Sequence, residues 1–372
     1  MQRFAFMLHP LSTGDVVRKF RIAKLMPDKV LERAFALLPP LKTSQITGIH
    51  SQHGETEGWF IACPLTPRLI MSMPQAYVIN KIIQGGRLAE KLGAKILGLG
   101  AFTKVVGDAG VTVARNLKIP VTTGNSYTVA TAIQSVREAA LVMGHDLKKA
   151  SVVILGATGS IGRVCALILA GEVRSMTLVA REERKLEELA AKVLYDTGLA
   201  VKITSDSKKA LRSGDIVITV TSAIDTLIEP EDLKPGAVVC DVARPRDVSK
   251  RVAEVRDDVL VIEGGVVEVP GDVEFNLNFG FPPKTAYACM AETMVLALEK
   301  RFESFTLGRE LRIEKVEEIA ALAKKHGFKL AGFRSFGRAI SLQEIEMIKR
   351  HARGAAILPA MNNNFELIPE SR

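Results

Sequence analysis

The sequence has few of the residues that build metal sites and disulfide frameworks. Its 372 residues include six histidines, which do not cluster, and four cysteines. The cysteines are widely separated and form no C-x-x-C pair: Cys63, Cys165, Cys240 and Cys289. This spacing argues against a zinc site and against a disulfide-stabilised fold, so we expect no bound metal.

Aromatic residues are also scarce, at 5% of the chain. The chain nevertheless carries 50 lysines and arginines against 41 acidic residues, a net charge of +9. Nucleic-acid-binding surfaces combine positive charge with stacking aromatics or a recognised motif, and neither accompanies the charge here. We therefore expect no nucleic-acid partner. An acidic partner fits the charge, either a small acidic carrier protein or an anionic membrane surface.

Long hydrophobic runs are missing as well. No apolar run reaches the roughly 20 residues that a membrane helix needs. Residues 1–11 are interrupted by Arg3, His9 and Pro10 and are too short for a secretory signal. We therefore predict a cytoplasmic protein, and the length of the chain predicts two hydrophobic cores.

The most informative motif is an apolar run that ends in three glycines spaced three residues apart. Residues 151–162 read Ser-Val-Val-Ile-Leu-Gly-Ala-Thr-Gly-Ser-Ile-Gly. A strand that turns sharply into a helix at glycines lets backbone N–H groups approach a dinucleotide pyrophosphate. The spacing differs from the commoner G-x-G-x-x-G, and an ordinary strand-to-helix turn is the alternative. The candidate cofactor-binding residues are Gly156, Thr158, Gly159, Ser160, Ile161 and Gly162.

The residues after the second strand of this unit, at 176–180, indicate which nicotinamide cofactor is bound. An NAD site has an acidic residue there that binds the ribose 2′-hydroxyl, whereas this chain has Arg181, followed by Arg184 and Lys185. A guanidinium suits the 2′-phosphate, so we predict NADPH. The alternative is a solvated helix start, in which the two glutamates that follow Arg181 face water.

The order of predicted elements indicates an α/β protein. After the glycine loop, strands alternate with helices as a doubly wound parallel sheet of Rossmann type requires. Before it, a hairpin and further strands and helices form a separate α/β unit. The expected strands of the first unit are 45–49, 58–63, 94–99 and 119–122, its helices are 75–92 and 127–143, and the strands of the second are 152–155, 176–179, 201–204, 216–220, 237–241 and 259–262.

We predict three parts: an N-terminal substrate domain at 1–147, an NADP(H)-binding domain at 148–282, and C-terminal helices at 283–372. The C-terminal part contains expected helices at 284–302 and 313–325, and a tail beyond about Met361 that we expect to be mobile. Loops after the parallel strands face the cofactor in this fold. Ser222 and Gly265, with their neighbours Thr221 and Gly264, are candidates for the nicotinamide end, although such residues also occur in ordinary turns.

Taken alone, Cys289 has the features of a small buried core residue.

Six segments of the sequence occur in a characteristic order. They are 99–102 (LGAF), 122–125 (TTGN), 156–162 (GATGSIG), 264–268 (GGVVE), 288–292 (ACMAE) and 326–328 (HGF). Together they resemble the long-chain acyl-[acyl carrier protein] reductases of the cyanobacterial alkane pathway. The resemblance spans about residues 40–330 and is weaker outside them.

The resemblance implies an enzyme that reduces a fatty acyl thioester to the aldehyde with NADPH. It implies that Cys289 becomes acylated and that His326 is a proton donor. Thr123, Gly124 and Asn125 are assigned to the substrate side, where Asn125 or backbone N–H groups would stabilise the oxyanion. Lys284 or the helix start would activate the thiol.

The implied partners are acyl carrier protein, or acyl-CoA, as acyl donor and an enzyme that consumes the aldehyde. Peripheral contact with a membrane would help to deliver an insoluble product. Apolar helices at 71–83 and 129–143 are candidates for an acyl pocket, with ordinary core packing as the alternative.

Three other functions remain open from the sequence. A reductase resembling glutamyl-tRNA reductase would have a polar pocket and bind RNA. A dehydrogenase resembling shikimate dehydrogenase would need a Lys/Asp pair and no nucleophilic cysteine. A non-catalytic sensor of NADPH or acyl groups would bind its ligands without turnover.

Overall fold

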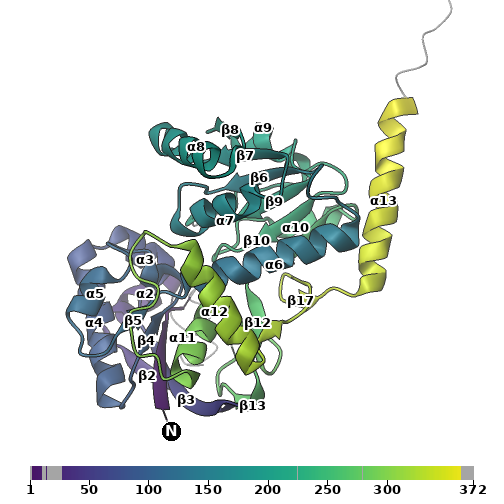
Figure 1. The fold of residues 1–372 in the computed structure, drawn as a ribbon. Helices are drawn as coiled ribbons and strands as arrows, with labels where there is room; N and C mark the ends of the chain where they lie inside the picture. Colours follow the sequence, from purple (N-terminus) through teal and green to yellow (C-terminus); the bar gives the residue numbers. More distant parts are fainter. Residues whose placement is uncertain (1, 11–13, 15–26, 224, 279, 362–372) are drawn as a thin grey trace, which may run out of the picture.

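The computed structural model describes residues 2–10, 14, 27–223, 225–278 and 280–361, and the following statements concern these residues. Two six-stranded sheets form the frame of the molecule, with helices packed around them (Figure 1). The expected tail beyond Met361 lies outside the described residues. Among the residues that are described, no helix has the length and apolar character needed to cross a bilayer.

The first sheet is mixed, with the strand order β13-β2-β3-β1-β4-β5. Strand β1 is parallel to β3 and β4, and β2 is antiparallel to β3 and β13. The strands are β1 (Gln2–Leu8), β2 (Leu41–Ser51), β3 (Gly54–Ala62), β4 (Leu97–Leu99), β5 (Val121–Thr122) and β13 (Gly271–Glu274). The helices along this part of the chain are α2 (Asp28–Leu37), α3 (Pro67–Ser72), α4 (Gln75–Lys91), the 3-10 helix η2 (Ala101–Lys104) and α5 (Val111–Arg115).

Strand β1 is central in this sheet, although the sequence analysis does not predict it. Phe4, Ala5, Phe6 and Met7 are buried at 1% exposure or less. This apolar run is too short to show a clear period, so pairing with β3 and β4 makes it a strand.

The second sheet is fully parallel and doubly wound, with the order β11-β10-β9-β6-β7-β8. This confirms the predicted α/β class and its Rossmann-type sheet. The strands are β6 (Ser151–Leu155), β7 (Ser175–Val179), β8 (Lys202–Thr204), β9 (Ile216–Thr219), β10 (Val238–Asp241) and β11 (Leu260–Glu263). The connections contain α7 (Ser160–Ala170), α8 (Glu183–Thr197), α9 (Ser207–Leu211), the 3-10 helix η3 (Pro230–Asp232) and α10 (Lys250–Val255).

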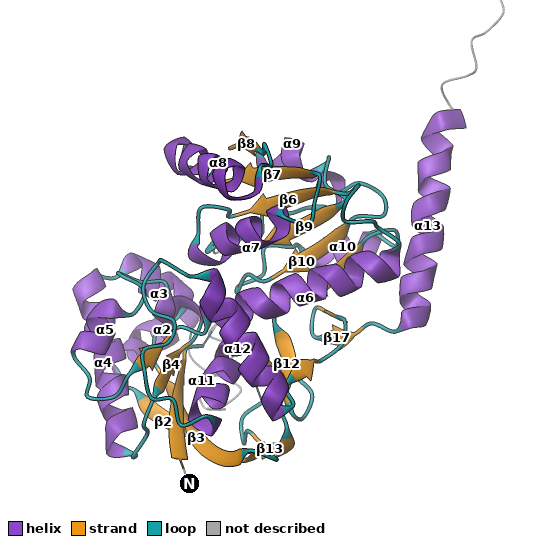
Figure 2. Cartoon of the chain, viewed as in Figure 1, coloured by secondary structure: helices purple, strands orange, loops and turns teal. Residues whose placement is uncertain are grey.

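The long helix α6 (Asn125–Met143) joins the two sheets (Figure 2). It packs against α7 and β10 on one side and against the C-terminal helices α11 (Ala288–Leu298) and α12 (Ile313–His326) on the other. Helix α11 lies directly on the first sheet, because a Cβ at Gly98 of β4 would lie 2.1 Å from Thr293 Oγ1. Strand β13 lies within the predicted NADP(H)-binding domain but pairs with β2 of the first sheet. The boundaries at 147 and 282 stay a prediction.

The start of α11 differs from the predicted helix at 284–302. Thr285–Tyr287 forms strand β14, which pairs with β12 (Val266–Glu268), and the helix begins only at Ala288. The double proline at 282–283 precedes a strand and not the helix, and Lys284 takes a positive φ of 61° between them. Cys289 therefore lies in the first turn of α11, closer to its positive end than the sequence predicts.

The remaining elements lie after α12. Strand β15 (Lys329–Leu330) joins β12 and β14, and β16 (Arg334–Ser335) pairs with β17 (Arg338–Ala339). Helix α13 (Leu342–Met361), which the sequence analysis does not predict, begins beside α6 and extends away from the rest of the molecule (Figure 1).

Candidate active site

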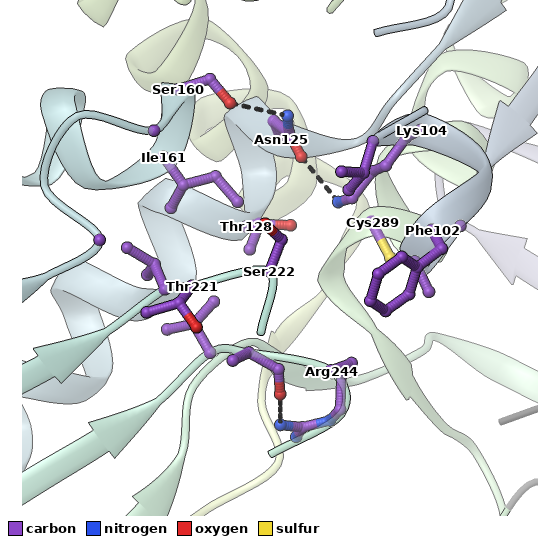
Figure 3. Close-up of a pocket in the computed structure, with 18 of the residues that line it drawn as sticks. Phe102, Lys104, Asn125, Thr128, Ser160, Ile161, Thr221, Ser222, Arg244 and Cys289 are labelled. Atoms are coloured by element: carbon purple, nitrogen blue, oxygen red, sulfur yellow. Dashed lines mark hydrogen bonds between the residues drawn. The ribbon is translucent and has the colours of Figure 1, made fainter. Parts of the chain in front are cut away.

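A cavity of about 1710 Å³ runs between the two sheets. Its walls come from the loops that follow β6, β7, β9, β10 and β11, from η2, and from the first residues of α6 and α11 (Figure 3). In a doubly wound sheet this edge is where a nucleotide binds. No group of three or more His, Cys, Asp or Glu side chains that could hold a metal ion occurs in the described part of the chain.

The glycine loop leaves the room that a dinucleotide pyrophosphate needs. Gly156 has a φ of 85°, and a Cβ there would lie 3.0 Å from the carbonyl oxygen of Val220. A Cβ on Gly162 would lie 2.4 Å from the carbonyl oxygen of Gly156, so this glycine lets α7 pack closely on the loop. Gly159 immediately precedes α7 and lines the cavity, and a Cβ there would lie 3.3 Å from the carbonyl oxygen of Gly156. The loop therefore fits the phosphates at the positive end of α7.

The structure brings most of the predicted cofactor residues to the cavity. Gly156, Thr158, Gly159, Ser160, Ile161, Arg181, Ser222 and Gly265 line it, whereas Gly162 serves packing. Arg184 does not reach it: its Nε donates to Glu188 Oε1 at 3.0 Å, and its side chain is 89% exposed. Arg184 is therefore the predicted 2′-phosphate residue that the structure leaves at the rim, paired with Glu188, which does line the cavity.

The loop that contains Thr221, predicted to lie at the nicotinamide end of the cofactor, is held in place by a buried aspartate. Asp247 is fully buried and accepts hydrogen bonds from the Thr221 hydroxyl at 2.6 Å and from the Thr221 N–H at 3.2 Å. Burial raises the pKa of Asp247 although these hydrogen bonds favour the carboxylate. Gly265, across the loop, accepts a hydrogen bond of 2.7 Å from Ala288 N, which joins this end of the cavity to the start of α11.

Cys289 lies beside this junction and is the one cysteine of the four that lines the cavity. Gly124, with a φ of 70°, lies against its main chain, since a Cβ there would be 2.4 Å from Cys289 Cα. Cys63 and Cys165 are fully buried, and burial raises the pKa of each thiol to about 12. Cys289 thus differs from them in being accessible from the cavity.

A chain of hydrogen bonds runs from Lys104, near Cys289, to Ser160 at the start of α7 (Figure 3). Lys104 Nζ donates to Asn125 Oδ1 at 2.6 Å, and Asn125 Nδ2 donates to Ser160 Oγ at 3.3 Å. Burial raises the pKa of Cys289, the positive charge of Lys104 lowers it, and the negative charge of Glu292 raises it. The protonated thiol is therefore the resting form, and Lys104 is the group that favours the thiolate.

Glu292, one turn after Cys289, holds the neighbouring elements together. It is fully buried, accepts from Thr122 Oγ1 at 2.6 Å and accepts the Tyr127 N–H at 2.9 Å. Burial raises its pKa. The carboxylate connects α11 to the end of β5 and the first turn of α6, and so it fixes Gly124 and Asn125 next to Cys289.

Three residues predicted for catalysis or substrate binding do not line the cavity: Thr123, Gly124 and His326. His326 is buried, with Nε2 at 2.7 Å from Glu299 Oε1 and Nδ1 at 2.7 Å from Ser51 Oγ, so the structure does not support its predicted role as proton donor. Thr123 is also buried, and its N–H donates to the carbonyl oxygen of Thr306.

Lys284 is not near enough to activate the thiol either. It pairs with Asp272 at 2.9 Å at the surface, outside the cavity. This corrects the prediction that Lys284 would activate Cys289, because the strand β14 separates it from α11.

The cavity also contains residues that the sequence analysis missed. Lys104 lies two residues after the segment 99–102, and this proximity was the available signal. Arg244 Nε donates to the Tyr287 hydroxyl at 3.1 Å, and its Nη2 is buried without a hydrogen-bond partner among the described residues. Arg244 lies in a loop after β10 that has no motif, so sequence reasoning had no means to find it.

One wall of the cavity is apolar and comes from the first sheet. It includes Phe6, Leu8, Phe35, Leu41, Ala62, Met71 and Val105. From the predicted acyl-pocket helices, at 71–83 and 129–143, only Met71 lines the cavity. Most of the other apolar residues of those helices pack in the cores, as the alternative of ordinary core packing predicted.

The chain is similar in sequence to a family of dehydrogenases and to several named proteins. A model for the shikimate / quinate 5-dehydrogenase family matches residues 138–263. The chain is 32% identical over 364 residues to a protein named aminotransferase PigE from Serratia sp. (strain ATCC 39006), covering 94% of the chain and 42% of that protein. The chain therefore spans less than half the length of this relative.

Two kinds of reductase are also similar. Identity is 28% over 305 residues with the long-chain acyl-[acyl-carrier-protein] reductase of Synechococcus elongatus, covering 78% of the chain and 87% of that enzyme. It is 26% over 182 residues with the glutamyl-tRNA reductase of Synechocystis sp. (strain ATCC 27184), covering 46% and 41%. Together these matches support an NAD(P)-dependent oxidoreductase with a Rossmann-type domain, and the predicted NADPH is consistent with them.

Proposed function

We propose that this chain reduces a long-chain acyl thioester, carried on acyl carrier protein or coenzyme A, to the fatty aldehyde with NADPH through a thioester on Cys289. The observation that carries the proposal is the position of Cys289, where the dinucleotide loop, the Lys104–Asn125 pair and the apolar wall meet in one cavity. An NADPH site, a nucleophile and an apolar surface are the three parts that this reaction needs.

The first half of the reaction is a thioester exchange at Cys289. The positive charge of Lys104 favours the thiolate, which attacks the carbonyl carbon of the acyl donor. The bond between that carbon and the donor sulfur breaks, and the donor leaves as a thiolate that takes up a proton. The bonds formed and broken are of the same kind, so the step needs little driving force.

The second half releases the aldehyde. NADPH, when bound, supplies a hydride to the carbonyl carbon of the acyl group held by Cys289. Asn125 Nδ2 has a second hydrogen beyond the one given to Ser160, and with Lys104 it would stabilise the negative oxygen. The carbon–sulfur bond then breaks as the carbonyl re-forms, and Cys289 returns as a thiolate.

The apolar wall would hold the acyl chain. Phe6, Leu8, Phe35, Leu41 and Met71 come from four different elements, and together they line the same cavity as Cys289. Burying an alkyl chain there gains about 0.8 kcal/mol for each methylene removed from water. This apolar wall argues against a glutamyl-tRNA-reductase-like enzyme, which would need a polar pocket.

The shikimate-dehydrogenase-like alternative needs a lysine paired with an aspartate. The lysine beside Cys289, Lys104, pairs instead with the amide of Asn125, which cannot take up a proton at neutral pH. No aspartate is among the residues that line the cavity in the described chain. This pairing favours the thioester reaction over an alcohol oxidation.

The similarity to an aminotransferase suggests what consumes the product. More than half of that relative lies outside the match, and an aldehyde is an amino acceptor for transamination. We expect the aldehyde to be converted to an amine by a separate aminotransferase unit. Amine formed from an acyl donor and NADPH by this chain alone would contradict this assignment.

The proposed function is tested by product analysis. Wild-type protein with NADPH and palmitoyl-CoA should form hexadecanal and consume one NADPH per aldehyde, whereas Cys289→Ala should bind NADPH normally and form no aldehyde. Equal turnover by Cys289→Ala would favour the dehydrogenase alternative, and NADPH binding without turnover on any acyl thioester would favour the sensor.

A further inference from the structure

We propose that Arg309 binds the 2′-phosphate of NADPH from the side of the first sheet, opposite Arg181, so that the phosphate is held across the cavity. The inference rests on the cofactor of the proposed function and is independent of its acyl substrate. It assigns a residue that follows α11 to a site whose other residues belong to the second sheet.

The segment that carries Arg309 is fixed on the first sheet by main-chain hydrogen bonds. Thr123 N donates to the carbonyl oxygen of Thr306 at 2.9 Å, and Gly308 N donates to that of Ala109 at 3.0 Å. Thr306 N donates to Thr122 Oγ1 at 3.2 Å. Arg309 is therefore presented from a fixed position, which reduces the entropy lost when its side chain binds a ligand.

The side chain of Arg309 reaches the end of the cavity where β7 ends. Its Nη2 donates to the carbonyl oxygen of Gly107 at 2.9 Å, and the residue lines the cavity together with Arg181, Glu182 and Lys185. Lys185, Arg181 and Arg309 all act on one carboxylate: the Lys185 hydrogen bond lowers the pKa of Glu182, and the two guanidinium charges lower it further. Arg181, which follows β7 of the second sheet, and Arg309, which is held on the first sheet, thus line the same cavity and lie near the same carboxylate.

The charges at this end suit a phosphate dianion. Arg181 makes no hydrogen bond or salt bridge with any described residue, and Arg309 uses only one of its five N–H donors. Glu182 is already paired with Lys185 at 2.8 Å, so its negative charge is compensated before a ligand binds. Guanidinium groups bind phosphate oxygens in a fork, and two such groups on opposite sides would distinguish NADPH from NADH.

The experiment compares Arg309→Gln with wild type by isothermal titration calorimetry, using NADPH and NADH without acyl donor. Loss of one charge-assisted hydrogen bond should raise the Kd for NADPH about tenfold or more. The Kd for NADH should change less than about twofold, since NADH has no 2′-phosphate. Arg137→Gln is the matched control, because Arg137 Nε donates to Glu172 Oε2 at 2.9 Å and neither residue lines this cavity, so the variant should bind both cofactors as wild type does.

The Arg309→Lys variant and the wild-type titration separate the possible outcomes. Arg309→Lys keeps the charge and loses the fork, so it should have an intermediate Kd for NADPH even if the glutamine variant is poorly folded. Equal weakening of NADPH and NADH, or an unchanged Kd for NADPH in folded Arg309→Gln and Arg309→Lys, would overturn the inference. Wild-type protein that binds neither cofactor would contradict the proposed function itself, which is a distinguishable result.

Discussion

Gly124 is packed against the main chain of Cys289 so closely that it leaves no room for a side chain. It combines a φ of 70° with a position where a Cβ would lie 2.4 Å from Cys289 Cα. Gly124→Ala should therefore lower turnover at least about tenfold and destabilise the protein by about 2–4 kcal/mol, as measured by urea unfolding.

Gly144 offers a matched control for this substitution. Its φ is 82°, but nothing lies within 4 Å of the place where a Cβ would be. Gly144→Ala isolates the backbone strain and should cost only about 1–2 kcal/mol with normal turnover. If Gly124→Ala were no worse than Gly144→Ala, the close contact with Cys289 would have no functional weight.

Lys104 is the residue that we expect to set the reactivity of Cys289. Because burial raises the pKa of this thiol and the Lys104 charge lowers it, Lys104→Met should move the pKa further upward. The rate of Cys289 alkylation by iodoacetamide, followed against pH, should then rise at higher pH than in wild type. Lys284→Met, which removes a lysine outside the cavity, should leave the profile in place, and a parallel shift in both variants would refute this role.

At the scale of elements, His326 joins helix α12 to the β2–β3 hairpin through Ser51 and to Glu299 at the end of α11. Burial lowers the pKa of His326 below its usual 6.5, although Glu299 favours the protonated ring. The unfolded chain then binds the proton more readily, so stability should fall as the pH falls below about 6.5.

Urea unfolding at about pH 7.5 and about pH 5.5 measures this dependence. His326→Gln should be less stable than wild type at the higher pH and should lose less on acidification, because it has no proton to gain. A wild-type free energy of unfolding that does not decrease towards the lower pH would contradict the assignment.

The elements also indicate how far sequence reasoning reaches. The glycine loop and the parallel strands were predictable because Gly156 and the apolar runs before it act locally. The start of α11 was not, because the pairing of Thr285–Tyr287 with β12 is a tertiary contact that overrides the helix-initiating prolines. The same holds for the site: the Cys289 segment was visible in sequence, whereas Lys104, Arg244 and Arg309 meet the cofactor cavity only through the fold.

At the scale of the whole molecule, the net charge of +9 predicts how an acidic carrier protein would associate. Screening weakens contacts between opposite charges, so the KM for an acyl group on acyl carrier protein should rise severalfold between about 50 mM and about 500 mM salt. The KM for an uncharged acyl N-acetylcysteamine thioester should stay nearly constant. An equal response of both donors would mean that the charge does not serve carrier binding.

The covalent role of Cys289 is the central claim, and intact-protein mass spectrometry after mixing with palmitoyl-CoA in the absence of NADPH tests it most directly. Wild type and Cys63→Ala, which removes a thiol buried away from the cavity, should each gain one palmitoyl mass that disappears as hexadecanal when NADPH is added. Cys289→Ala should gain none. Folded wild-type protein that binds NADPH but gains no acyl mass from several donors, or a Cys289→Ala variant that is acylated as wild type is, would contradict the account.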